Sequence, residues 1–205
     1  SAALADGINV NITLMFSPRH VRQVFDACAE GLERRHAMGR PLQPVRAVAS
    51  LFVSRVDTLL DASLPAGAEA LRGSMGIANA RAAYAQWLDR FGGAAFAALR
   101  AAGARPPLCL WASTSVKDPA WPATHYVDAL IGPDTVNTVP EATLAAYAEQ
   151  GAPERTLDAA LPEARALLAR AAELGIDLDD AGERLQSDGL QQFEQAFARL
   201  LQTVA

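Results

Sequence analysis

The segment from Gly7 to Pro18, with the sequence GINVNITLMFSP, constrains the fold of this chain more than any other. Its apolar run over residues 8–16 predicts a buried strand whose far end carries polar side chains. Ser17 is a favourable helix cap and Pro18 suits the first helical position, so a helix is expected to begin at once. A strand that leads directly into a helix is the repeating unit of α/β folds. In α/β barrels the chemistry lies at the carboxyl ends of such strands.

Three more apolar segments predict strands, and helical periodicity fills most of the chain between and after them. Strands are expected at 8–16, 45–53, 108–112 and 135–138, and helices at 1–6, 18–38, 68–91, 94–102, 126–130, 140–150, 157–173, 177–185 and 188–203. Residues 56–66 predict a loop or a short helical turn, and Thr138-x-x-Glu141 matches a capping box. The alternation predicts parallel strands with right-handed crossovers, in either a half barrel or a small open sheet.

The length favours a single domain over residues 1–205. Strand–helix units are expected in 1–150, with a helical insertion at 57–105, and a helical tail in 151–205. The net charge of −5 and the pI near 5.2 argue against nucleic-acid and polybasic membrane partners. No apolar run is long enough to span a bilayer and no leader pattern is seen, so a cytoplasmic protein is expected.

The cysteines and histidines of the chain favour neither a disulfide framework nor a metal site. Cys28 and Cys109 are far apart in the sequence and are expected to be small buried hydrophobes. The three histidines, His20, His36 and His125, are scattered, and no pair has ligand spacing. No metal is therefore expected.

Polar side chains follow the ends of all four predicted strands. They are Asn11, Thr13, Ser50, Arg55, Ser113, Ser115, Lys117, Asn137 and Thr138. Hydroxyls, amides and two cations that meet at one mouth would suit a sugar phosphate, because an arginine fork matches phosphate geometry. The alternative is structural: serine and threonine often cap helices, and Arg55 could be an ordinary surface arginine.

Lys117 is the single lysine of the chain, whereas the other basic residues are 17 arginines. Schiff-base chemistry within these residues would therefore have one side-chain candidate. A Schiff-base lysine is expected to be desolvated. Lys117 lies in the polar segment STSVKDP, beside Asp118, which favours a phosphate contact or an ion pair instead.

Several motifs together resemble the transaldolase family over essentially the whole chain. The segments are GINVNITLMFS at residue 7, FVSRVD at residue 52, LWASTSVKDP at residue 110 and YVDALIGPDTVNTVP at residue 126, of which the third resembles one bacterial branch of the family. The resemblance implies a (β/α)8 TIM-type barrel and an enzyme that needs no cofactor. Such enzymes move a dihydroxyacetone unit between sugar phosphates through a lysine Schiff base, in the non-oxidative pentose phosphate pathway.

The resemblance also assigns roles to individual residues. Thr13 and Asn11 resemble the catalytic threonine and asparagine. Ser50 and Arg55 resemble the serine and phosphate-binding arginine of the next strand, and Ser113 the serine of the strand after it. The second phosphate-binding arginine has no clear match, and either Ser115 or Lys117 stands in its place. The implied substrates are fructose 6-phosphate, sedoheptulose 7-phosphate, erythrose 4-phosphate and glyceraldehyde 3-phosphate.

In the family the first strand of this chain is the fifth of eight, so the chain is expected to hold the last four strands and a helical tail. The Schiff-base lysine and the proton-transferring acids lie upstream of Gly7 in that pattern. The chain alone is therefore expected to be inactive, and to need a complementary N-terminal half or to self-associate. Two alternatives stay open: a non-catalytic phosphosugar-binding half barrel, and a different Schiff-base aldolase that uses Lys117.

Overall fold

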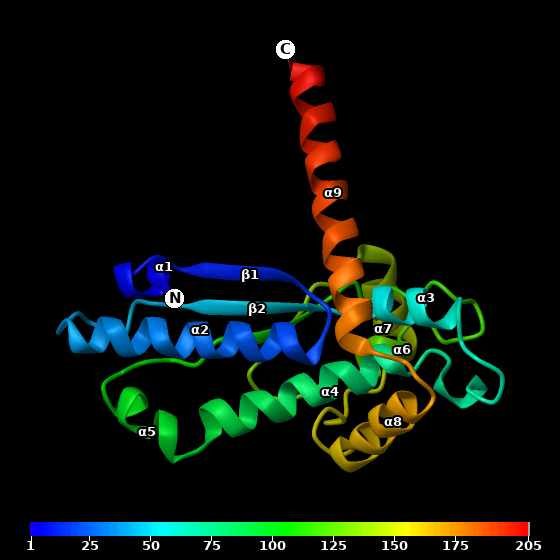
Figure 1. The fold of residues 1–205 in the computed structure, drawn as a ribbon, viewed down its shortest axis with the longest axis horizontal. Coiled ribbons are helices and arrows are strands. Elements are labelled where there is room, and N and C mark those ends of the chain that lie inside the picture. Colours follow the sequence, from blue (N-terminus) through cyan, green and yellow to red (C-terminus); the bar gives the residue numbers. More distant parts are fainter. Residues whose placement is uncertain (205) are drawn as a thin grey trace.

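The computed structural model describes residues 1–204 and contains a parallel sheet with the strand order β1-β2-β3-β4 (Figure 1). The strands are β1 (Val10–Met15), β2 (Ala47–Phe52), β3 (Leu108–Ala112) and β4 (Thr135–Asn137). The helical elements are α1 (Ala2–Asp6), α2 (Pro18–Ala37), α3 (Ser54–Asp61), η1 (Glu69–Leu71), α4 (Met75–Trp87), η2 (Leu88–Gly92), α5 (Ala94–Ala101), α6 (His125–Ala129), α7 (Glu141–Gln150), α8 (Leu161–Glu173) and α9 (Leu178–Val204). The predicted α/β class and parallel pairing are confirmed.

The outer face of the sheet packs against α2 and α4 and forms the main core (Figure 1). Alternate strand residues point to this face, among them Ala49, Leu51 and Trp111. Tyr84 and Trp87 of α4 stack in the same core with ring centroids 5.7 Å apart. Burial of this apolar surface is the main force that holds the helices on the sheet.

The opposite face of the sheet, called the inner face below, carries several side chains that are exposed to solvent. Asn11 and Thr13 are exposed on β1, and Leu108 and Val136 are 36% and 38% exposed on β3 and β4. The strand register places these side chains on the same face as Ser50. Polar groups therefore share this face with apolar ones.

Two predicted boundaries were wrong near the ends of the strands. Residues 56–66 were expected to be a loop or a short helical turn; a short helix, α3, does form, but it begins earlier, at Ser54, and packs Val56 and Leu60 into a second core. The predicted capping box does not form, since Pro140 is the N-cap of α7 and the Thr138 hydroxyl donates to the carbonyl of Trp111. The neighbouring strand β3 therefore takes the hydroxyl that a capping box would use.

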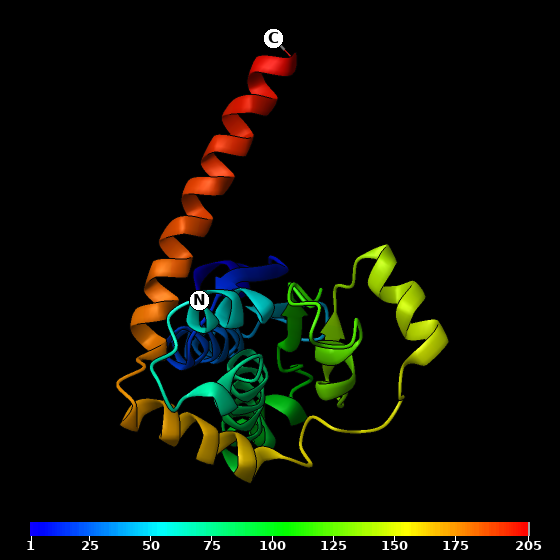
Figure 2. The ribbon, with the colours of Figure 1, turned by 90° about the vertical axis from the view of Figure 1, so that its right-hand side faces the viewer.

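The helical tail also differs from the prediction, because residues 177–185 and 188–203 belong to one helix, α9. Gly189 does not break it. Instead Gly189 is buried, and an added Cβ would lie 3.0 Å from Leu14 Cδ2, so the glycine lets α9 approach β1. The first part of α9 packs on the body while the rest projects beyond it (Figures 1 and 2). None of the helices in residues 1–204 is long and apolar enough to cross a membrane.

Candidate functional site

The end of β1 has an irregular backbone. The pairing with β2 shifts register between Ile12 and Met15, and Leu14 has φ +59 although it is buried. Ser113, just after β3, has φ +55. Left-handed conformations are costly for residues other than glycine, and such strain clusters at functional sites. Both residues lie where the chemistry of a parallel α/β sheet is expected.

The bulge of β1 is held in place by α9. The side-chain amide of Gln186 donates to the carbonyl of Leu14 at 2.9 Å. This hydrogen bond satisfies a carbonyl next to Thr13 that the irregular pairing leaves available. No local sequence pattern predicts this contact, because the two residues are far apart in the chain.

Asn11 and Ser50 form one polar pair on the inner face. The Ser50 hydroxyl donates to Asn11 Oδ1 at 2.6 Å, across the β1–β2 pairing. Ser50 is 2% exposed and Asn11 is exposed. The pair leaves the amide group of Asn11 facing the open side of the sheet, with Thr13 two residues further along the same face.

Arg55, Ser113 and Lys117 line a cavity of about 580 Å³ beyond the carboxyl ends of β2 and β3. The rest of its lining is formed by Ser54, Thr58, Leu59, Ala62, Leu185, Asp188 and Gln192. Its walls therefore come from α3, from the loop after β3 and from α9. The volume is in the range of small-molecule sites.

The guanidinium of Arg55 is oriented from two sides. Its Cζ atom lies 5.4 Å from the centre of the Phe52 ring, and its Nη1 donates to Gln192 Oε1 at 3.3 Å. The hydroxyls of Ser54 and Ser113 share a hydrogen bond of 2.9 Å between α3 and the loop after β3. This hydrogen bond links the carboxyl ends of β2 and β3 at the cavity.

Lys117 is exposed, and its Nζ donates to Ser115 Oγ at 2.7 Å. Ser115 contacts Lys117 but does not line the cavity. With Arg55, Lys117 gives the cavity two cationic groups, while Asp188 adds one carboxylate.

The structure therefore divides the predicted site residues into two groups. Arg55, Ser113 and Lys117 come together at the cavity, whereas Asn11, Thr13 and Ser50 lie on the inner face of the sheet. The remaining strand-end residues have structural contacts: the Thr114 hydroxyl donates to Asn137 Oδ1 at 2.7 Å, and Thr138 binds the end of β3.

A buried carboxylate, Asp57, lies on α3 behind the cavity. It is 2% exposed and accepts hydrogen bonds from Gly76 N at 2.8 Å and from the Tyr126 hydroxyl at 2.9 Å. Burial raises the pKa of Asp57 to about 6, and the two hydrogen bonds oppose that rise. Gly76 is required there, because a Cβ would lie 2.6 Å from Val53 O.

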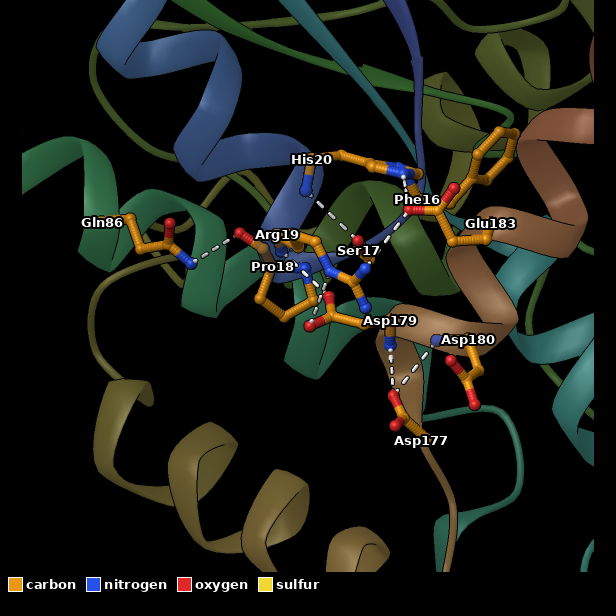
Figure 3. A network of polar contacts seen from close by, with 10 residues as sticks. All are labelled: Phe16, Ser17, Pro18, Arg19, His20, Gln86, Asp177, Asp179, Asp180 and Glu183. Atoms are coloured by element: carbon orange, nitrogen blue, oxygen red, sulfur yellow. Dashed lines mark hydrogen bonds and ion pairs between the residues drawn. The ribbon is translucent and has the colours of Figure 1, made fainter.

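The start of α9 is fastened to the start of α2 by a polar network (Figure 3). Asp179 accepts from Arg19 N at 3.0 Å and pairs with the Arg19 guanidinium at 3.4 Å. His20 Nε2 lies 3.3 Å from Glu183 Oε1, and His20 Nδ1 accepts from Phe16 N. This network fixes the helix that supplies Gln186 and Gln192 to the site.

Comparison with known proteins identifies the family. The model of the transaldolase/fructose-6-phosphate aldolase family matches residues 1–204. The chain belongs to this family. It is 50% identical to a transaldolase of Neisseria gonorrhoeae over 97% of the chain and 56% of that protein. It is 49% identical to a transaldolase of Thiobacillus denitrificans and 46% identical to one of Thermobifida fusca, over 95% and 100% of the chain.

The chain spans somewhat more than half the length of these transaldolases, from 55% to 57%. The family membership predicted from the motifs is confirmed. Three of the site residues predicted from the sequence, Arg55, Ser113 and Lys117, do line the cavity. Ser54, Asp57 and Gln192 were not predicted as site residues. Ser54 stands beside Arg55 in the FVSR motif, which was the one available signal. Nothing local to Gln192 could have placed α9 at the cavity.

Among residues 1–204, histidine, cysteine, aspartate and glutamate side chains do not form a group of three or more suited to a metal ion. The cationic, hydroxyl-rich cavity is chemically suited to an anion instead. Arginine offers a planar fork of donors and lysine a point charge, and both form strong charge-assisted hydrogen bonds with phosphate oxygens.

Proposed function

We propose that this protein is a transaldolase and that residues 1–204 supply the phosphate-binding side of its active site. The observation that carries the proposal is the meeting of Arg55 and Lys117 at one cavity beyond the ends of neighbouring parallel strands. The phosphate of a sugar phosphate binds there, between the guanidinium and the amine. The Ser113 hydroxyl completes the shell of donors.

The inner face then holds the carbon chain of the sugar. Asn11 and Thr13 offer an amide and a hydroxyl on the open side of β1, and Ser50 keeps the Asn11 side chain in one orientation. The reaction is the transfer of a dihydroxyacetone unit between sugar phosphates through a lysine Schiff base. The donors are fructose 6-phosphate and sedoheptulose 7-phosphate, and the acceptors are erythrose 4-phosphate and glyceraldehyde 3-phosphate, in the cytoplasmic pentose phosphate pathway.

Lys117 binds phosphate in this proposal, and the Schiff-base lysine lies outside the 205 residues. Lys117 is exposed and its amine is hydrogen-bonded to Ser115, whereas a nucleophilic lysine is usually activated by desolvation or by a neighbouring cation. Attack by Lys117 on the sugar carbonyl would also leave the phosphate to Arg55 alone.

The four strands are the last four of a (β/α)8 barrel in this proposal. Two features support it: the inner face exposes Leu108 and Val136, and β1 and β4 are both edge strands. Exposed apolar side chains and unpaired strand edges are stabilised by further strands. A complementary N-terminal half or a second copy of the chain would supply them.

Borohydride trapping with fructose 6-phosphate tests the proposal. The full-length protein and a chain of residues 1–205 are each treated, and the adduct is located by intact mass and peptide mapping. We expect a reduced adduct in the full-length protein on a lysine other than Lys117, and none in the shorter chain. An adduct on Lys117 would establish the other Schiff-base aldolase, and no adduct in either protein would favour a non-catalytic sugar-phosphate-binding protein.

A further inference from the structure

Asp57 lines a second, smaller cavity of about 180 Å³, which adjoins the anion cavity. The two cavities share Thr58 and Lys117 in their linings, so only a thin wall of side chains separates them. Asp57 stands two residues after Arg55 on α3 and lines the smaller cavity. Lys117 lines this smaller cavity as well as the anion cavity, so the Asp57 carboxylate shares a cavity with one of the two cations of the anion site.

The groups packed around Asp57 are mostly acidic or neutral. Asp61 on α3 and Asp118 in the loop after β3 line the same small cavity, with Arg72 before α4. Tyr126 and His125 face it from α6; the Tyr126 hydroxyl donates to the carboxylate, and His125 is stacked on Trp121 at 4.7 Å between ring centroids. Lys117 and Arg72 are the two cations of this lining, and both side chains are exposed to solvent.

A negative charge at position 57 is not required to satisfy these neighbours. The amide oxygen of an asparagine would accept from Gly76 N, and its NH₂ group could donate to the Tyr126 oxygen. Burying the charged form instead costs stability. The packing therefore does not need this charge. Because the charge lies behind a cationic cavity, it repels any anion that enters the cavity.

Building on the proposed function, we infer that Asp57 is a proton-linked regulator of the anion site, and that a sugar phosphate or other dianion binds more tightly when the Asp57 carboxyl is protonated. The ionised carboxylate repels the incoming anion and attracts Lys117 toward the smaller cavity. Protonation removes both effects while the Tyr126 and Gly76 contacts keep the side chain in place.

Linkage makes the coupling reciprocal: if protonation strengthens anion binding, then anion binding raises the proton affinity of Asp57. Anion binding is therefore accompanied by proton uptake near the pH at which Asp57 titrates. Its pKa of about 6 places this uptake just below neutral pH.

Calorimetric titration with sulfate on the full-length protein tests the inference. Sulfate stays a dianion from about pH 5 to about pH 8, so the probe itself does not titrate in this range. The affinity of the wild-type protein is expected to rise roughly threefold to tenfold as the pH falls across this range, beyond the rise in Asp57→Asn. Buffers of different ionisation enthalpy will report proton uptake that Asp57→Asn lacks. Asp6→Asn, on exposed α1, is the control and keeps the wild-type dependence.

The contributions of all other titratable groups remain in Asp57→Asn, so the difference between the two proteins isolates Asp57. Tyr126→Phe gives a signature that a structural role would not. Loss of the hydroxyl removes a hydrogen bond that lowers the Asp57 pKa, so the midpoint of the pH dependence moves to higher pH.

The outcomes separate this inference from the proposed function. Sulfate binding that needs Arg55 but has the same pH dependence in Asp57→Asn would overturn the inference and leave the phosphate site intact. Sulfate binding that is insensitive to Arg55→Ala, or absent at every pH, would overturn both.

Discussion

The outer face of the sheet and its inner face differ in what fixes their side chains. On the outer face, residues such as Leu51 and Trp111 are almost fully buried in the main core, and burial explains their apolar character. On the inner face, Asn11 and Thr13 are exposed beside Leu108. The comparison teaches that burial stabilises the first face, whereas the second combines exposed polar and apolar side chains, to which the proposed function assigns contacts with substrate and with further strands.

The largest expected effect tests the outer face. Trp111→Ala removes a side chain that is 1% exposed and whose Nε1 donates to the carbonyl of Leu130 at 3.0 Å. We expect the free energy of unfolding to fall by about 3–5 kcal/mol in urea titrations. Leu108→Ala on the inner face of the same strand should cost less than about 1 kcal/mol in residues 1–205 alone. Equal losses would remove the distinction between the faces.

Asp57 lies on α3, beyond the carboxyl end of β2, and its effect on stability depends on pH. Its folded pKa of about 6 is above the ordinary value of 3.8, so the folded state holds the proton more tightly. The stability that this proton provides is complete below about pH 4 and is lost as the pH rises to about 6, a loss of roughly 2–3 kcal/mol. Urea unfolding of Asp57→Asn across this range should lack that loss. The same slope in both proteins would contradict the assignment.

Lys117 tests the exposed side of the cavity. Lys117→Gln should weaken binding of fructose 6-phosphate to the full-length protein by about 1 kcal/mol, roughly fivefold, because one charge-assisted hydrogen bond is lost near solvent. Lys117→Arg should retain most of the affinity. Abolition of Schiff-base trapping by Lys117→Arg would show instead that the amine is the nucleophile.

The smallest expected effect concerns α9, which packs against the second core and also lines the cavity. Gln192→Ala removes the acceptor for Arg55 Nη1 and should weaken fructose 6-phosphate binding about twofold to threefold, since the contact is exposed. Gln191→Ala, its exposed neighbour on α9, is the matched control and should bind as the wild type does. Identical effects of both substitutions would mean that Gln192 does not orient Arg55.

Much of the outer face could be predicted from the sequence, because apolar periodicity records burial directly. It located all four strands and the helices α2 and α4 that cover them. Periodicity could not show that α9 continues through Gly189, since that glycine serves a close approach to Leu14 that only the folded chain creates. A local sequence pattern does not predict contacts between segments that are distant in the chain.

The candidate site was predictable where a motif stood at a strand end, as with Arg55 and Ser113. It was not predictable where function depends on burial or backbone strain. Asp57 resembles a solvated helical aspartate in sequence, and its burial follows from the approach of α4 through Gly76. The left-handed conformations of Leu14 and Ser113 oppose local preference and follow from tertiary contacts.

The central claim is that Arg55 recognises the phosphate group of the substrate. Its most direct test compares binding of fructose 6-phosphate and of unphosphorylated fructose to the full-length protein and to Arg55→Ala. Arg46→Ala, at the opposite end of β2, serves as the control. We expect Arg55→Ala to weaken binding of the phosphate ester by about 2 kcal/mol, roughly thirtyfold, and to leave fructose binding unchanged. Equal losses for both sugars, or no loss for either, would contradict the account.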